Sequence, residues 1–359
     1  MPDVLTHILV ADLGGTHATV AIFAYRGGDL FDPVSQRTYS SRGITDFPAL
    51  LQEYLEKEGS HLEPAVSKAC IDFAGPVEPG RLKAFATNLA WGFTVEEIRT
   101  RTGLSEITLM NDFEAVGYGF EILMANKPEA FVRLSEAGEL PRNRGSRKTA
   151  VIIGAGTGLG TSIMILDSKI GRFRPIPGEG GHADFAAVEE IEFRIAQWIR
   201  RNRNHSPLNP IDCEKVVSGP GIANIYQALW ELEPGKGSRA VFDEVSMADA
   251  YDRPAIIARN AHAEDLCRRT LDIWVRCYAR AAKNSAVFPL APGGVFLAGG
   301  VAAKVLSELQ TGRFMEEFTR CDVPGIRALL EHTPVFVITD YGIGLYGCAS
   351  VALNPAQLD

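Results

Sequence analysis

Alternating strands and helices predict an α/β protein with two domains. Two similar segments support this prediction, each made of a strand, a glycine-rich turn containing threonine, and a second strand. They span residues 7–25 and residues 150–166. Such a repeat indicates a duplicated architecture with a cleft between the halves. The 359 residues suffice for two domains of ordinary size.

Local signals place the other elements. Thr94 and Glu97 form a capping box, in which each side chain satisfies a backbone amide at a helix start. Gly103 suits the left-handed end of that helix. Proline in a first turn and apolar periodicity predict further helices over residues 48–58, 264–282 and 301–310, and apolar runs predict strands over residues 294–298 and 334–339.

Composition limits the function classes. The chain is 46% hydrophobic and 22% charged, with a net charge of -8, so it has no general attraction for nucleic acid or anionic membranes. The N-terminus lacks a signal peptide pattern, and no apolar run approaches the length of a membrane span. Six dispersed cysteines fit reduced thiols. We therefore expect a cytoplasmic protein that binds neither nucleic acid nor membrane.

The glycine turn at residues 154–160 is the densest motif. Four glycines in seven residues, between two apolar strands, remove side-chain packing and cost backbone entropy. No G-K-[ST] follows, so it is not a Walker loop, and a strand follows where a dinucleotide fingerprint needs a helix. Contact with a phosphate is favoured over a purely structural turn.

Two further glycine segments leave alternatives open. The glycines of Asp12–Thr16 let backbone amides approach a phosphate, and the Asp12 carboxylate could hold Mg²⁺ through water. A plain hairpin turn explains this segment equally well. Gly299 and Gly300 lie between a strand and a helical pattern, where a nucleotide contact at the helix start and a tight turn are equal alternatives.

A polar pair, Asn111 and Asp112, follows an apolar strand. The carboxyl ends of strands are where α/β proteins place ligands, so Asp112 could take the proton from an attacking hydroxyl. A helix N-cap at Asp112 is the simpler alternative and would be preferred without other evidence.

The loop at residues 177–184 carries Glu179 and His182, three residues apart among glycines. A carboxylate and an imidazole together offer an acceptor and a donor, which vicinal sugar hydroxyls require. A metal site that adds Asp184 is the rival interpretation. Glu214 is a further carboxylate, which could equally be a surface residue.

Together these segments resemble the bacterial glucokinase family, a branch of the sugar kinase, Hsp70 and actin superfamily. The match keeps its order over nearly the whole chain. The segments that carry it are ADLGGT at 11–16, TNLAW at 87–91, MNDFEAV at 110–116, GAGTGLG at 154–160, PGEGGHADFA at 177–186, SGPG at 218–221 and FLAGGV at 296–301.

The resemblance implies a two-domain actin-like (ribonuclease H-like) sugar kinase fold with an interdomain cleft. Its domains would be residues 1–121 plus 341–359 and residues 122–340. It implies ATP as co-substrate, Mg²⁺, and glucose as phosphoryl acceptor, with a homodimer as a possible assembly.

The resemblance also implies residue roles. Asp112 would be the general base, and Asp12 would hold Mg²⁺ through water. The sugar ligands would be Asn111, Glu179, His182 and Glu214. The nucleotide contacts would be Ala11, Asp12, Leu13, Gly14, Gly15, Thr16, Gly154, Gly156, Thr157, Gly158, Gly299 and Gly300.

One feature departs from the pattern of the family, and another separates the chain from a related family. His17 stands where the first loop of the family commonly has asparagine, which leaves a side-chain contact at that position open. The zinc-binding cysteine cluster of the related repressors and kinases is missing from the sequence. The remaining alternatives are another hexose kinase, using mannose, an N-acetylated sugar or polyphosphate, a non-catalytic sugar-binding regulator, and an actin-like structural ATPase.

Overall fold

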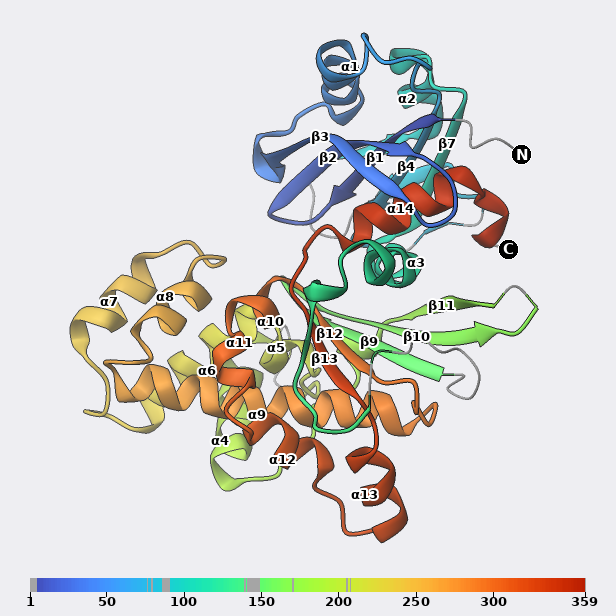
Figure 1. Cartoon of the computed structure of the whole chain (residues 1–359). Coiled ribbons are helices and arrows are strands. Elements are labelled where there is room, and N and C mark those ends of the chain that lie inside the picture. The colour runs from blue at the N-terminus through green and yellow to red at the C-terminus, as the bar shows by residue number, and fades with distance from the viewer. Residues whose placement is uncertain are drawn as a thin grey trace. The chain divides into compact units, whose positions relative to one another are not determined.

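A computed structural model describes residues 5–75, 77–78, 80–85, 91–138, 140, 149–169, 171–204, 206 and 208–358 (Figure 1). Motif residues 87–90 lie outside the described residues. The chain forms two compact units. The first unit holds residues 1–130, 167–177 and 340–359, and the second holds residues 131–166 and 178–339. The domain bounds at 121/122 and 340/341 remain a prediction.

The first unit contains a five-stranded sheet of order β3-β2-β1-β4-β7. β2 pairs antiparallel with β1 and β3, whereas β1, β4 and β7 are parallel neighbours. Its strands are β1 (Thr6–Leu13), β2 (His17–Tyr25), β3 (Phe31–Ser40), β4 (Lys68–Phe73) and β7 (Glu106–Asn111); β5 (Lys83–Phe85) and β6 (Gly92–Thr94) form a separate pair.

Helices cover both faces of this sheet (Figure 1). One apolar core joins α1 and α2 to one face, and α3 and α14 pack on the other. The helices are α1 (Phe47–Glu58), α2 (Val95–Thr102), α3 (Asp112–Asn126) and α14 (Ile343–Leu353), with short 3-10 turns at Ser41–Gly43, Pro128–Ala130 and Pro355–Leu358.

The second unit holds most of a six-stranded sheet of order β11-β10-β9-β12-β13-β8, of which residues 172–177 of β11 are assigned to the first unit. β9, β12 and β13 are parallel neighbours, while β10 and β8 run antiparallel to β9 and β13. The strands are β8 (Phe131–Arg133), β9 (Thr149–Ala155), β10 (Leu159–Asp167), β11 (Arg172–Gly178), β12 (Val295–Ala298) and β13 (Val335–Ile338).

The long helix α9 (Asp265–Val287) packs against β9 and β12 and organises the core of this unit. Thirteen of its residues are buried, which explains the apolar spacing predicted over residues 264–282. The other helices are α4 (Glu190–Arg203), α5 (Glu214–Val217), α6 (Gly219–Leu232), α7 (Arg239–Met247), α8 (Arg253–Asn260), α10 (Gly300–Lys304), α11 (Leu306–Leu309), α12 (Arg313–Thr319) and α13 (Pro324–Glu331), with a 3-10 turn at Gly180–His182.

The two sheets share one topology. In each, two further strands lie parallel to the first strand of an antiparallel hairpin: β4 and β7 with β1 in one sheet, and β12 and β13 with β9 in the other, to which β8 is added at the edge. The repeat of strand, glycine turn and strand in the sequence therefore reflects a repeated α/β unit, and the predicted fold class is confirmed.

Local predictions were confirmed at α2. The Thr94 side chain accepts from the Glu97 amide, the Glu97 carboxylate accepts from the Thr94 amide, and Gly103 adopts φ 73 at the helix end. The helix predicted over residues 301–310 is instead split into α10 and α11 at Val305, which has φ -107 and ψ 28. Among the described residues, no helix has both the length and the apolar character that a membrane span needs.

Glycines let α14 cross α3 at very short range. A Cβ on Gly347 would lie 1.9 Å from the Ala115 carbonyl oxygen, and one on Gly119 would lie 1.9 Å from the Ile343 carbonyl oxygen. Such distances are far inside van der Waals contact, so only glycine fits at both positions. The crossing holds the C-terminal helix on the first unit.

We therefore expect Gly347→Ala to lower the free energy of unfolding by about 1–3 kcal/mol, because the added methyl forces the two helices apart. The measurement is thermal and urea unfolding of both proteins. Gly325→Ala in α13 is the control, since a Cβ there meets no atom within 4 Å. Equal melting temperatures for the two variants would contradict the packing described here.

Candidate active site

The glycine turn between β9 and β10 docks onto the start of α6. Gly156 donates its amide to the Gly158 carbonyl at 2.9 Å, and its own carbonyl accepts from the Gly219 amide at 2.8 Å. Ser218 caps α6 by accepting from the Gly221 amide at 3.1 Å. The motifs GAGTGLG and SGPG therefore form one structural unit, although about sixty residues separate them in the sequence.

Glu214, the first residue of α5, reaches this glycine turn. Its Oε2 accepts from the Leu159 amide at 2.8 Å, and a Cβ on Gly158 would lie 2.5 Å from that oxygen. Glycine at 158 is therefore needed to admit the carboxylate. The half-buried Glu214 is fixed in place, which excludes the alternative of an unattached surface residue.

The loop that carries Glu179 and His182 is held on β10. Thr161 donates its hydroxyl to the Gly178 carbonyl at 2.8 Å and accepts from the Gly180 amide at 3.1 Å. The Glu179 and His182 side chains are 75% and 57% exposed, and 3.9 Å separates Glu179 Oε2 from His182 Nε2. The backbone is thus anchored while both polar groups stay accessible to a ligand.

A short antiparallel bridge joins this loop to the segment before Glu214. Asp184 pairs with Asp212, the Cys213 amide donates to the Ala183 carbonyl at 2.8 Å, and the Phe185 amide donates to the Ile211 carbonyl at 2.9 Å. The second unit thereby brings Glu179, His182 and Glu214 together. For the rival metal site, no group of three His, Cys, Asp or Glu side chains suited to a metal ion occurs in the described part of the chain.

Gly299 and Gly300 lie beside the same turn. β12 pairs with β9 so that Ala298 is opposite Gly154. Gly299 has φ 87, and a Cβ there would lie 2.4 Å from the Ala155 carbonyl oxygen. This close approach is a structural reason for glycine at 299, and it places the start of α10 next to Gly154–Ala155.

The first glycine turn, Asp12–Thr16, is a hairpin turn in the first unit. The Gly14 amide donates to the His17 carbonyl at 3.0 Å. Two hydrogen bonds from Ser41 stabilise the turn. The Ser41 hydroxyl donates to the Gly14 carbonyl at 2.7 Å, and the Ser41 amide donates to the Thr16 carbonyl at 3.0 Å. The His17 side chain is exposed.

A second carboxylate lies beside Asp12. Asp72 is directly opposite Asp12 in the parallel pairing of β1 with β4, so the two side chains share one face of the sheet. A Cβ on Gly344, in the first turn of α14, would lie 3.2 Å from Asp72 Oδ2 and 3.9 Å from Asp12 Oδ2. Sequence reasoning missed Asp72; its one signal is a charged residue inside the apolar strand KACIDF.

The buried position of Asp72 changes its acidity. The side chain is 1% exposed, its Oδ2 accepts from the Cys348 thiol at 3.3 Å, and its Oδ1 has no hydrogen-bond partner among the described residues. Burial, followed by the negative charges of Asp12 and Asp112, raises the pKa of Asp72 well above its usual value. Burial also raises the pKa of Asp12, against which the hydrogen bond with Asp72 acts.

Asn111 and Asp112 have different structural roles at the start of α3. Asn111 is the N-cap of α3: its Oδ1 accepts from the Phe113 amide at 2.9 Å and from the Glu114 amide at 3.2 Å, and its Nδ2 donates to the Gly75 carbonyl at 3.1 Å. The alternative that made Asp112 the cap is therefore wrong. Asp112 is the first residue of the helix, and its Oδ1 also accepts from the Phe113 amide, at 3.0 Å.

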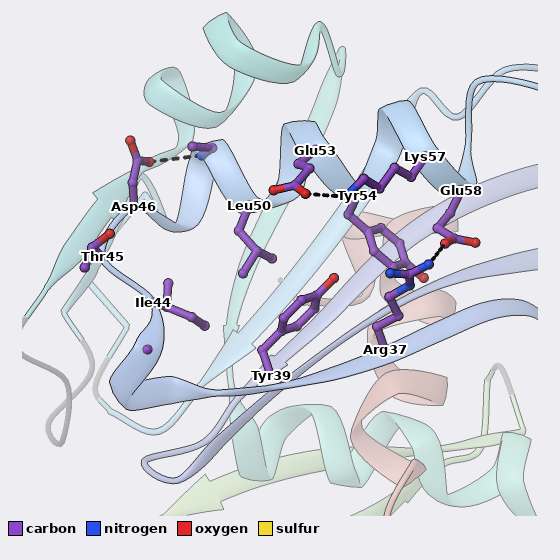
Figure 2. A pocket seen from close by; sticks show the side chains of 12 residues that line it. Arg37, Tyr39, Ile44, Thr45, Asp46, Leu50, Glu53, Tyr54, Lys57 and Glu58 are labelled. Atoms are coloured by element: carbon purple, nitrogen blue, oxygen red, sulfur yellow. Dashed lines mark hydrogen bonds and ion pairs between the residues drawn. The ribbon is translucent and has the colours of Figure 1, made fainter.

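A separate pocket of about 390 Å³ lies between β3 and α1 in the first unit (Figure 2). Tyr39 and Tyr54 line it, and Arg37 pairs with Glu58 at its rim. None of the residues predicted for sugar, nucleotide or metal binding lines this pocket.

The fold is that of sugar kinases. The crystal structure of a glucokinase from an Antarctic psychrotroph superposes with a TM-score of 0.75 at 27% identity, covering 97% of this chain and 99% of that one. At 17% identity, the Streptomyces griseus ROK family glucokinase in complex with glucose and AMPPNP has a TM-score of 0.64 and covers 98% and 99% of the two chains.

Sequence comparison defines the family. The glucokinase family model matches residues 9–355. The glucokinase of Nostoc punctiforme is 32% identical over 366 aligned residues, which cover 97% of this chain and 99% of that protein. The chain belongs to the glucokinase family, and the predicted resemblance is confirmed.

The buried acid pair yields a pH-dependent prediction. Because Asp72 holds its proton more tightly in the folded chain than in the unfolded chain, its contribution to stability falls as pH rises from about 4 through its raised folded pKa. Asp72→Asn removes this titration. The variant should therefore gain stability relative to the wild type as pH rises, by about 1.4 kcal/mol for every pH unit that separates the pKa of Asp72 in the unfolded chain from its pKa in the folded chain.

Urea unfolding between about pH 4 and pH 8, without nucleotide or Mg²⁺, measures this difference. Asp322→Asn, at an exposed position, serves as the control and should differ from the wild type by a constant amount. A difference for Asp72→Asn that does not change with pH would show that Asp72 is ionised in both states.

Proposed function

We propose that this glucokinase-family chain transfers the γ-phosphoryl group of ATP to the 6-hydroxyl of glucose, with Asp112 as general base. The observation that carries the proposal is that Asn111 and Asp112 have different positions at the start of α3. Asn111 provides the cap, so capping does not account for a carboxylate at 112. Asp112 follows the carboxyl end of β7, the edge at which α/β proteins bind ligands.

The sugar would be held by four side chains from the two units. In the second unit, Glu179, His182 and Glu214 lie on segments joined to one another by backbone hydrogen bonds, with Glu179 and His182 open to a ligand. Asn111 of the first unit would add an amide. A site that pairs sugar hydroxyls with buried or fixed polar groups discriminates strongly against analogues lacking them.

The reaction needs little covalent chemistry from the protein. In phosphoryl transfer an enzyme mainly positions the reactants and stabilises charge. Asp112 would orient the 6-hydroxyl and accept its proton as the new O–P bond forms and the bond from phosphorus to the ADP oxygen breaks. Asp112 belongs to the first unit and Glu179 to the second.

Two glycine turns would bind the nucleotide through backbone amides. They are Asp12–Thr16 together with Ala11, and Gly154–Gly158 with the neighbouring Gly299 and Gly300. Mg²⁺, when bound, neutralises charge on the phosphates. Mg²⁺ takes one or two carboxylates and keeps several waters. The half-buried Asp12 carboxylate, backed by the unpaired Oδ1 of Asp72, fits this demand.

The proposal also covers cellular context and organisation. The net charge of -8 gives no general attraction for nucleic acid or anionic membranes, and the six dispersed cysteines, which suit reducing conditions, support a cytoplasmic location. A homodimer, and domains of residues 1–121 plus 341–359 and 122–340, complete the proposal.

Substrate assignment is tested by a coupled ADP-release assay. We expect the purified protein to release ADP with Mg-ATP and glucose, and to do so much more slowly with mannose or N-acetylated sugars. Polyphosphate in place of ATP should give no glucose 6-phosphate. Faster turnover of N-acetylmannosamine than of glucose, or a preference for polyphosphate, would assign the chain to another hexose kinase activity. Glucose binding without turnover would indicate a regulator.

The role of Asp112 is tested by Asp112→Asn. Since Asn111 remains as the cap, we expect a melting temperature close to that of the wild type and retained glucose binding by calorimetry. Loss of the base should lower kcat by about 10²–10⁴-fold. Asp46→Asn, at the N-cap of α1 in the same unit, is the matched control and should keep full activity. A kcat near the wild-type value in Asp112→Asn would remove Asp112 from the mechanism.

A further inference from the structure

One acidic residue that was not predicted to bind a ligand contacts the loop at residues 177–184, which carries the proposed sugar ligands Glu179 and His182. Asp212 lies two residues before Glu214, and its Oδ2 is 3.5 Å from Nδ1 of His182. Asp212 is 24% exposed, whereas His182 is 57% exposed. The contact is at the long end of hydrogen-bonding distance, as is common for site residues that tighten only when substrate binds.

Several interactions fix the position of Asp212. Its backbone pairs with Asp184, and its Oδ1 accepts from the Lys215 amide at 3.2 Å, in the first turn of α5. The Lys215 ammonium lies 4.0 Å from Asp212 Oδ2 and donates to Asn204 Oδ1 at 2.6 Å. The carboxylate is thus held at the start of α5, with Oδ2 beside the His182 ring.

The chemistry of the pair decides which nitrogen of His182 carries the proton. A neutral imidazole has one donor and one acceptor nitrogen, and a carboxylate can only accept. A carboxylate at Nδ1 therefore favours the tautomer with the proton on Nδ1. The Glu179 carboxylate lies 3.9 Å from Nε2, beyond hydrogen-bonding distance, so the Asp212 contact decides the tautomer and Nε2 is left as an acceptor.

We propose that Asp212 is a positioning residue that orients His182 and holds it in the Nδ1–H tautomer, so that Nε2 accepts a hydrogen bond from a sugar hydroxyl. Glu179 and His182 would then both be acceptors for hydroxyl donors. Asp212 also connects the segments of two proposed sugar ligands, because its Oδ2 contacts His182 and its Oδ1 accepts from the Lys215 amide in the helix that begins at Glu214. This inference rests on the proposed sugar-binding role of His182.

The tautomer can be read without any sugar. In the ligand-free wild type at about pH 8, long-range ¹H–¹⁵N correlation of ¹⁵N-histidine-labelled protein should show His182 protonated at Nδ1 and unprotonated at Nε2. The spectrum of His182→Gln assigns the signals. Free imidazoles of histidine favour the proton on Nε2, so a His182 signal of that kind in the wild type would overturn the proposal.

Asp212→Ser separates positioning from helix capping. Serine is a good acceptor for the Lys215 amide, but it is too short to reach His182. We expect the Nε2–H tautomer to become dominant and the glucose KM to rise about three- to tenfold, the effect of one misdirected hydrogen bond. The ATP KM and kcat should stay within about twofold.

Asp184→Asn is the matched control. It removes a nearby exposed carboxylate that has no side-chain hydrogen bond or ion pair to the described residues, and it should change neither tautomer nor KM. An unchanged His182 tautomer in Asp212→Ser would overturn the proposal, as would equal rises in the KM of glucose and of ATP. The wild-type tautomer decides the matter even if Asp212→Ser fails to fold. Failure of the wild type to phosphorylate glucose would instead refute the proposed substrate.

Discussion

Parallel strand pairing is the constraint on which both parts of the candidate site depend. Since β1, β4 and β7 run in the same direction, their carboxyl ends lie at one edge of the sheet, and the register puts Asp12 directly beside Asp72. Ionising two neighbouring buried carboxylates is unfavourable, because burial and the repulsion between like charges both disfavour the charged form. The protein accommodates them with a thiol donor from Cys348 and with the first turn of α14 nearby.

The second sheet has the same parallel pairing, but the residues at its edge are glycines instead of acids. There the parallel strands β9 and β12 bring Gly154 beside Ala298, so a glycine turn and a strand-to-helix glycine pair meet at one edge. Because the glycines have no side chains, other groups can approach the backbone at this edge. This allows Glu214 to reach the Leu159 amide, which links the glycine turn at residues 154–160 to the start of α5.

Sequence reasoning found the features that depend on neighbours along the chain. The capping box of α2, the glycine turns and the α/β alternation all follow from local rules, and the family motifs located Glu214. It missed Asp72 and Asp212, because their importance comes from partners on other elements. Asp72 matters through Asp12 and Cys348, and Asp212 through His182.

Two errors have similar causes. An aspartate and an asparagine in sequence are both good caps, and only the backbone geometry shows that Asn111 is the N-cap. Apolar periodicity over residues 301–310 cannot report the change of backbone angles at the single residue Val305, which divides α10 from α11.

The crossing of α14 over α3 has a consequence for how the protein is made. Helix α14 (residues 343–353) belongs to the first unit, but it is translated only after the whole second unit. Until then a nascent chain lacks the helix that packs on β1, β4 and α3. The apolar face around Ile8, Val10 and Phe23 then lacks the cover that α14 gives it, including Tyr346 on Phe23, and apolar surface exposed in this way makes a nascent chain prone to aggregate.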